Sequence, residues 1–167
     1  MTLTFTDFFS IAPFEWHAVF TSILCGTIIG LERQLRGKPV GIRTSALITL
    51  GTYIFIAGSM LVSTAATDPS RIIGQVITGI GFLGAGVMLA RDGMVMGVTS
   101  AATIWTLASV GVCIAIGHHI IAIKLSLVVV SVLVGVDTLE DYSQALRRGV
   151  HKTYQDWRKG KSNGSSE

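Results

Sequence analysis

The sequence holds 167 residues, of which 50% are hydrophobic and only 14% are charged, with a mean hydropathy of +0.61 and a formal net charge of +3. A soluble domain usually carries about 25% charged residues, so the composition excludes an ordinary soluble globular protein. The charged residues cluster and leave long uncharged runs, which is typical of a polytopic membrane protein. The positive net charge therefore bears on orientation in the membrane, and we expect no nucleic-acid partner.

We predict an all-α polytopic membrane protein with about five transmembrane helices, over residues 15–31, 44–62, 71–90, 98–116 and 120–136. The nineteen residues of 72–90, at about 1.5 Å each, give roughly 28 Å, close to a hydrocarbon thickness of about 30 Å. Residues 91–97 read as a short turn. The chain then divides into a five-span domain, 1–136, and a cytoplasmic tail, 137–167, where a basic amphipathic helix precedes a disordered end.

Orientation follows from the Lys and Arg residues, which concentrate in cytoplasmic loops. In a five-span arrangement eleven of the thirteen lie on one side, and only Arg71 and Lys124 lie on the other. We therefore predict an outer N-terminus, a cytoplasmic C-terminus and a bacterial inner-membrane location. Cys25 and Cys113 fall inside apolar runs, where we expect small buried side chains and no disulfide.

Residues 68–90 form the stretch around which we expect the bundle to be organised. It is apolar, yet it contains five glycines: Gly74, Gly79, Gly81, Gly84 and Gly86. Each interior glycine costs a helix in water about 1 kcal/mol relative to alanine, whereas lipid forces the backbone into a helix. The glycines would then offer flat surfaces to neighbouring helices. Tight packing is one interpretation, and a flexible gate or re-entrant element is the other.

A helical wheel at 100° per residue sorts the small residues of this stretch onto two faces with Gln75 between them, so we expect two close neighbours. The fourth span offers a matching strip: Gly97, Ala101, Ala108, Gly111 and Ala115. The spacing Gly79-x-Gly81-x-x-Gly84 matches a dinucleotide-binding fingerprint, but it lacks the preceding strand that this motif needs.

Polar and aromatic side chains inside the spans are few. Gln75 either hydrogen-bonds across helices or coordinates an ion. Thr99 begins the fourth span, where hydroxyl groups can bond their own helix backbone. Trp105 lies too deep for the interfacial belt, so we expect it to fill a gap between helices. In the first span, the spacing Gly26-x-x-x-Gly30 predicts a helix contact.

Ionisable residues lie at the ends of spans and not at their middles, which lowers the expectation of a proton-coupled transporter. Asp68 reads as a helix N-cap paired with Arg71, or else as a divalent-ion ligand. The first loop carries a motif that either fixes topology or binds anionic lipid or an acidic partner. Its residues are Glu32, Arg33, Arg36, Gly37, Arg43 and Thr44.

Enzymatic chemistry is not indicated. The sequence shows no Ser/His/Asp, Cys/His or paired-carboxylate arrangement, so we expect neither catalysis nor a cofactor. The adjacent His118 and His119 lack acidic company, and we expect neutral turn residues and not a metal site there.

Three stretches resemble the MgtC/SapB family of bacterial inner-membrane proteins: residues 30–44 (GLERQLRGKPVGIRT), 68–87 (DPSRIIGQVITGIGFLGAGV) and 97–105 (GVTSAATIW). The resemblance implies a five-span membrane domain, roles in growth under low magnesium and in survival inside macrophages, and modulation of membrane proteins such as the F-type ATP synthase. Better-known members add a cytoplasmic C-terminal α/β domain, for which the thirty-one residues of 137–167 are too few.

The resemblance carries over a set of motif positions, which are Glu32, Arg33, Gly37, Arg43, Thr44, Asp68, Arg71, Gln75, Gly79, Gly81, Gly84, Gly86, Thr99 and Trp105. We expect a non-enzymatic regulatory protein in contact with membrane lipids and with a second copy of itself or another inner-membrane protein. The alternative is an oligomeric ion or small-solute channel or transporter.

Overall fold

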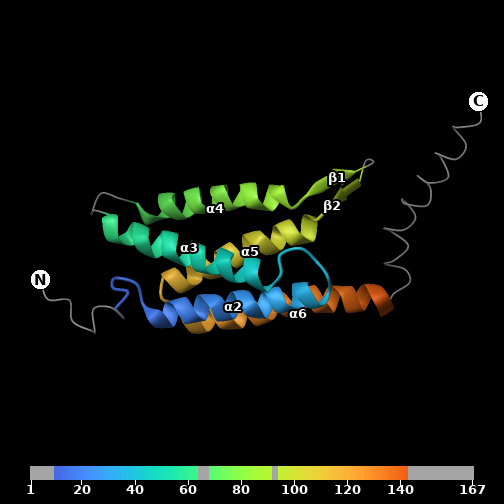
Figure 1. Cartoon of the computed structure of the whole chain (residues 1–167), viewed down its shortest axis with the longest axis horizontal. Coiled ribbons are helices and arrows are strands. Elements are labelled where there is room, and N and C mark those ends of the chain that lie inside the picture. The colour runs from blue at the N-terminus through green and yellow to red at the C-terminus, as the bar shows by residue number, and fades with distance from the viewer. Residues whose placement is uncertain (1–9, 64–67, 92–93, 143–167) are drawn as a thin grey trace, which may run out of the picture. The chain divides into compact units, whose positions relative to one another are not determined.

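The computed structural model describes residues 10–63, 68–91 and 94–142. Five helices and one hairpin lie within these ranges (Figure 1): α2 Trp16–Leu35, α3 Ile42–Val62, α4 Pro69–Gly86, β1 Leu89–Arg91, β2 Met94–Met96, α5 Val98–Ala115 and α6 His119–Tyr142. Of the described helices, α2, α3, α5 and α6 are long and apolar enough to cross a membrane. The predicted all-α membrane architecture is therefore confirmed, while the orientation of the termini stays a prediction.

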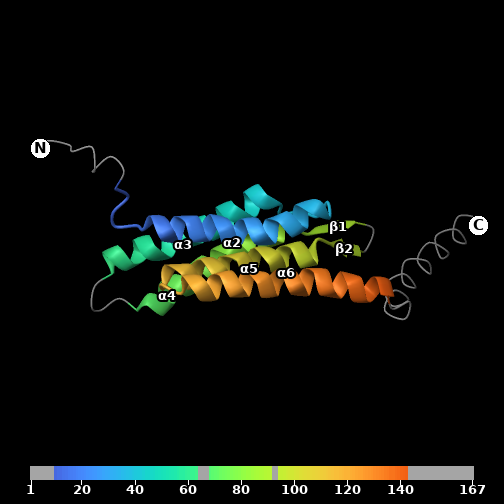
Figure 2. The same cartoon turned by 90° about the horizontal axis from the view of Figure 1, so that it is seen from below.

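Helix α4 differs from the other predicted spans. It has 18 residues and is not among the helices that are apolar enough to cross a membrane by themselves. It packs beside α5 and, over a smaller contact, beside α3 (Figures 1 and 2). The predicted end at residue 90 is wrong, because α4 stops at Gly86. Closely spaced glycines weaken a helix end.

The segment after α4 is a two-stranded hairpin and not the plain turn expected over residues 91–97. Strands β1 and β2 pair antiparallel, with Leu89 opposite Met96. The dipeptide at 92–93, Asp-Gly between two apolar runs, is a strong hairpin signal in sequence. Gly97 joins the hairpin to α5 at a φ of +89°, and a Cβ there would collide with the Val87 carbonyl oxygen.

The other helix ends lie near their predicted positions, with two exceptions. Helix α2 continues past residue 31 to Leu35, so Glu32 and Arg33 are helical. Helix α6 continues past residue 136 to Tyr142, which places the predicted domain border inside this helix. By compactness the chain divides after Val130. The predicted amphipathic tail helix lies mostly in 143–167, outside the described residues.

Helices α2, α3 and α5 meet through glycines that allow backbone contact. A Cβ built on Gly26 would lie 2.5 Å from the Cα of Ala46, and one on Gly30 would lie 2.6 Å from the Cα of Ile42. The predicted Gly26-x-x-x-Gly30 contact is therefore confirmed, and it joins α2 to α3. Gly111 of α5 also faces α3, since its Cβ would lie 2.7 Å from the Thr49 carbonyl oxygen. The expectation that Gly111 faces the glycine-rich helix is wrong.

The core of the first unit gathers small side chains around one buried aromatic ring. Its fully buried members are Ala18, Cys25, Tyr53, Val110, Ile114 and Ala122. Tyr53 also fixes the start of α2, because its hydroxyl accepts a 3.1 Å hydrogen bond from the backbone N–H of Glu15. Phe14 packs edge-on against the Tyr53 ring at a centroid distance of 6.2 Å. The outer surface is apolar, as lipid requires, with Phe20, Phe55 and Phe82 among its exposed residues.

The first part of α6 joins this core through small residues. Ala122 and Ser126 are both fully buried, as is Cys25 on α2. The Ser126 hydroxyl donates to the Ala122 carbonyl oxygen within its own helix, a common arrangement for hydroxyls in apolar helices. Cys25 is buried as expected, and Cys113 is partly buried.

Candidate functional site

A buried cation links two helices at the end of the bundle that contains the first loop. Arg33 lies in the last turn of α2 and is only 3% exposed. Its Nη2 donates a 2.9 Å hydrogen bond to Ser100 Oγ, in the first turn of α5, and Ser100 is also buried. A positive charge is favourable near a helix C-terminus, but burying it requires a partner. Ser100 provides one, whereas Arg33 Nε has no hydrogen-bond partner among the described residues.

The neighbouring carboxylate is buried as well. Glu32 is 7% exposed, and its Oε1 lies 2.8 Å from Nε of Arg36, one turn further along α2. The geometry is that of an ion pair, since neither Glu32 oxygen receives an aligned hydrogen bond within the described residues. Two arginines and one glutamate therefore leave an excess positive charge at this end. The sequence predicted that these residues lie in a loop, whereas in the structure Glu32 and Arg33 lie in the last turn of α2 and Arg36 is its C-cap residue.

The loop that follows is shaped by backbone hydrogen bonds. The N–H of Lys38 donates to the Arg33 carbonyl, and the N–H of Gly37 donates to the Gln34 carbonyl. With Gly37 at a φ of +62°, these two bonds form a Schellman motif, in which glycine is favoured because it lacks a Cβ. The predicted motif position Gly37 therefore terminates α2, and open space surrounds it.

A cavity of about 740 Å³ lies between α3 and α4. Nine of its fourteen lining residues are apolar or glycine, and the polar ones are Arg43, Thr44, Thr52, Ser59 and Gln75. No Asp or Glu is among the described residues that line it. The motif residues Arg43, Thr44, Gln75 and Gly79 are thus brought together by the packing of α4 beside α3. Both Arg43 and Thr44 are exposed and belong to the first turn of α3.

Thr52 is the buried polar group of this cavity. It is 2% exposed, and its Oγ1 has no hydrogen-bond partner among the described residues. Its neighbour one turn earlier, Thr49, instead donates to the Ser45 carbonyl oxygen at 3.0 Å. No sequence pattern marks Thr52, because a threonine in an apolar helix normally bonds its own backbone.

Two predicted interior residues face outward. Gln75 is exposed at the cavity and makes no cross-helix hydrogen bond within the described chain, so the prediction that it lies deep in the bundle is wrong. Trp105 is 54% exposed and does not fill a gap between helices. Thr99 is exposed too, and its carbonyl oxygen accepts a hydrogen bond from the Thr103 hydroxyl. Position along a helix was predictable, but the direction of each side chain depends on how the helix is rotated against its neighbours.

Asp68 caps α4 as predicted. Its Oδ1 accepts a 2.9 Å hydrogen bond from the N–H of Ser70, and Pro69 occupies the first turn. Hydrogen bonds from the side chain and backbone of Ser70 hold the pKa of Asp68 below its usual value. Within the described residues, no ion pair joins Asp68 to Arg71, and both are exposed. The cap is therefore confirmed and the predicted pairing is not seen.

The glycines of α4 are mostly without neighbours in the single chain. A Cβ on Gly84 would touch Ala101 of α5 at 3.6–3.9 Å, whereas Cβ atoms on Gly74, Gly79, Gly81 and Gly86 would meet nothing within 4 Å. Among the glycines of α4, Gly84 is the one that approaches the small-residue strip of α5, at Ala101. Helix α4 lies at the edge of the described bundle and not at its packing centre.

A third group of polar side chains was not predicted from the sequence. Glu15, His17 and His119 bring their side chains together where α2 and α6 begin. A signal for it existed, because an antiparallel five-helix order places the starts of the first and fifth helices at the same end. The expectation that His119 is a turn residue without an acidic neighbour is wrong, because the Glu15 carboxylate belongs to this group.

Comparison with known proteins identifies the family of the chain. A model described as the MgtC family matches residues 19–142. The "Putative magnesium transporter YhiD" of Escherichia coli K12 is 37% identical over 150 residues, which are 86% of this chain and 66% of that protein. "Protein MgtC" of Salmonella typhimurium LT2 is 41% identical over 112 residues, 66% of this chain and 47% of that protein.

"Protein MgtC" of Brucella abortus 2308 is 39% identical over 132 residues, 77% of this chain and 54% of that protein. The chain thus spans from about half to about two thirds of the length of these relatives. No solved structure matches the chain.

Proposed function

Because the chain belongs to the MgtC family, we propose that it is a non-enzymatic protein of the bacterial inner membrane that acts through contact with a membrane partner. The partner is a second copy of the chain or another inner-membrane protein, whose activity it modulates. The name of the Escherichia coli relative mentions magnesium, and adaptation to low magnesium or to ion stress is the setting that we propose for this contact.

The exposed glycine surface of α4 carries the proposal. Elsewhere in the described helices, Gly26, Gly30 and Gly111 sit where two helix backbones touch, and Gly51 of α3 and Gly135 of α6 are single glycines beside open space. On α4, four glycines have open space beside them instead. In lipid, small residues promote helix association by close backbone approach, so a surface of this kind suits a helix from outside the chain. We define the α4 glycine surface as Gly74 and Gly81 on one face of the helix together with Gly79 and Gly86 on the other.

An ion or solute conduit is the second candidate, favoured by the cavity between α3 and α4 and by the name of the Escherichia coli relative. The chemistry of the lining argues against Mg²⁺ as its cargo. Mg²⁺ prefers carboxylate oxygens and bound water, whereas the charged side chain at this cavity is Arg43. A like charge repels the cation, so the contact proposal fits the described residues better.

Photo-crosslinking in native membranes tests the contact proposal. Phe82 is 81% exposed and lies within about 60° of Gly79 and Gly86 on the helical wheel. Replacing it with a photoreactive phenylalanine analogue should give a discrete crosslinked product, either a dimer or a complex with one partner. Phe20 on α2 is 64% exposed and provides the matched control. Equal products from both positions, or none from Phe82, would contradict the proposal.

Magnesium flux in proteoliposomes separates the second candidate from the first. We expect no flux above that of empty vesicles when the purified full chain is reconstituted. Flux that is lost on changing Gln75 to Leu, in a protein that remains folded, would support the conduit and overturn the main proposal.

A further inference from the structure

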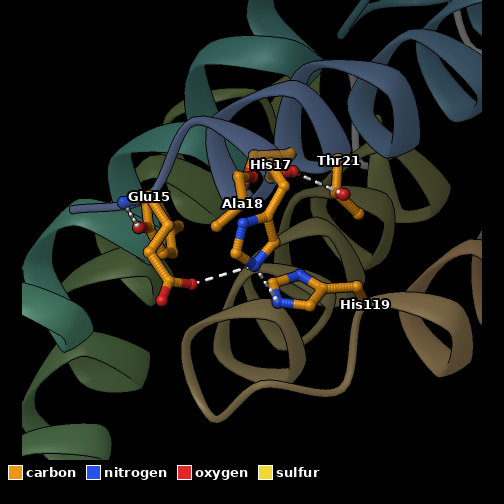
Figure 3. A network of polar contacts seen from close by, with 7 residues as sticks. Glu15, His17, Ala18, Thr21 and His119 are labelled. Carbon is orange, nitrogen blue, oxygen red and sulfur yellow. Dashed lines mark hydrogen bonds and ion pairs between the residues drawn. The ribbon is translucent and has the colours of Figure 1, made fainter. Parts of the chain in front are cut away.

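Three metal-binding side chains converge at the end of α2 opposite Arg33. Glu15 is the N-cap residue of α2, His17 lies in its first turn, and His119 is the first residue of α6. Figure 3 shows the carboxylate and both imidazole rings directed at one another. Glu15 Oε2 lies 2.9 Å from His17 Nε2, which lies 3.1 Å from His119 Nε2. All three donor atoms lie within 4.8 Å of one another.

Hydrogen bonds among these three side chains cannot satisfy both short contacts of His17 Nε2 at once. His17 Nε2 can carry one hydrogen, and that hydrogen cannot point fully at both Glu15 and His119. If His119 Nε2 carries the hydrogen instead, the lone pair of His17 faces the Glu15 carboxylate at 2.9 Å. A single cation in the centre would be bound by all three atoms at once.

We propose that Glu15, His17 and His119 form a binding site for a transition-metal ion, with Zn²⁺ as the best match. Two imidazole nitrogens and one carboxylate are a frequent ligand set for zinc with an open fourth position. At about 2.0–2.1 Å per bond and a tetrahedral angle, the ligand atoms would lie about 3.3–3.4 Å apart. The observed separations of 2.9 and 3.1 Å need to widen by only a few tenths of an ångström, and the third pair, Glu15 and His119, must reach the same spacing from within 4.8 Å.

The surroundings allow that adjustment and hold the helices in place. The side chains of Glu15 and His17 are about 60% exposed, so they can move and leave the fourth position open to water. The backbone is fixed more firmly, because the Glu15 N–H donates to Tyr53 and because Ala18 and Ala122 lie in the core. The carboxylate also offsets the positive ends of two helix dipoles.

The ligand set discriminates between metals. Mg²⁺ requires oxygen ligands in near-octahedral geometry, whereas imidazole suits zinc, copper and nickel. The site is therefore distinct from any role in magnesium handling. Bound metal would connect the start of α2 to the start of α6 at this end of the bundle.

Zinc binding to the full-length protein, purified without a histidine tag in detergent, tests the site. Equilibrium dialysis against micromolar Zn²⁺ should give one ion per chain, and millimolar Mg²⁺ should not displace it. His17→Gln and His119→Gln should each weaken binding by at least about tenfold, the lower bound seen when the supports of metal ligands are removed. His118→Gln is the matched control, since the adjacent ring is exposed and outside the cluster.

A second measurement separates loss of the site from loss of the fold. Zinc should raise the melting temperature of the wild-type protein and of His118→Gln, but not of Glu15→Gln, whose side chain is exposed. Absence of retained zinc in the wild-type protein would overturn the proposal. Equal loss of zinc from His118→Gln and His119→Gln would overturn it as well.

Discussion

Arg33 of α2 and Ser100 of α5 form a buried hydrogen bond of 2.9 Å between residues 67 positions apart in the chain. Ser100 is 2% exposed, so solvent does not replace it as the partner of the guanidinium group. Both residues come from stretches that resemble the family motifs. The bond therefore gives a physical reason for linking the first and third motif stretches.

Replacing Ser100 with alanine should destabilise the protein by about 1.5–3 kcal/mol, the range for hydrogen bonds to charged groups. The cause is a buried guanidinium that loses its partner. Ser109→Ala on the same helix is the control, because the Ser109 hydroxyl bonds only its own helix at the Trp105 carbonyl. We expect a change within about 0.5 kcal/mol there. Denaturant unfolding in mixed micelles measures both, and equal effects would contradict the assignment.

Glycine substitutions should distinguish internal contacts from the α4 glycine surface. Gly26→Ala places a methyl group 2.5 Å from the Cα of Ala46, so the helices must separate, at a cost of about 1–3 kcal/mol or more. Gly81→Ala meets open space and should leave the monomer unchanged or stabilise α4 by up to about 1 kcal/mol. Melting temperatures in detergent test the contrast, which a lower stability of Gly81→Ala would refute.

Replacing the Thr52 hydroxyl at the cavity by a methyl group should not lower the stability of the protein. Thr52→Val removes a buried Oγ1 that lacks a partner, so we expect no loss of stability and a gain of up to about 1 kcal/mol. Thr49→Val on the same helix should cost about 0.5–1.5 kcal/mol, because it removes the hydrogen bond to Ser45. Unfolding free energies of the two variants check this. A large loss in Thr52→Val would indicate that its hydroxyl has a partner.

The cap of α4 should weaken in acid. Hydrogen bonds from Ser70 lower the pKa of Asp68 in the folded protein, so the cap's stabilisation is fully present above the unfolded pKa of about 3.9. It is lost as the pH falls through the lowered folded value. Hydrogen exchange of the first turn of α4, compared with Asp68→Asn at each pH, measures this. The two proteins should match at neutral pH and diverge below about pH 4, where the asparagine cap persists.

The number and order of the helices could be predicted because hydropathy and helix ends are local properties. The cap at Asp68 and the Gly26-x-x-x-Gly30 contact followed from short motifs for the same reason. The rotation of each helix is not local. Gln75 and Trp105 were expected inside the bundle on depth alone, whereas Gln75 is exposed at the cavity between α3 and α4 and Trp105 is exposed on α5.

The candidate sites were harder to predict than the helices. Arg33 looked like a loop residue that fixes topology, and its burial appears only because α2 extends by a turn and meets α5. Glycines gave an ambiguous signal, since the same residue type marks a backbone contact at Gly26 and open space at Gly81. Which of these applies depends on tertiary or quaternary neighbours that no local pattern specifies.

The β1–β2 hairpin fixes how deeply the bundle can enter a bilayer. A two-stranded sheet leaves the outer edge of each strand without backbone partners, and hydrocarbon penalises every such group by several kcal/mol. Where lipid surrounds it, the hairpin therefore remains at the level of headgroups and water, where its exposed side chains Leu89, Val95 and Met96 can rest against the lipid surface. The end of α4 at Gly86 and the start of α5 at Val98 are tied to that level. The six paired residues of the hairpin thus limit how far this end of the protein can enter the hydrocarbon region.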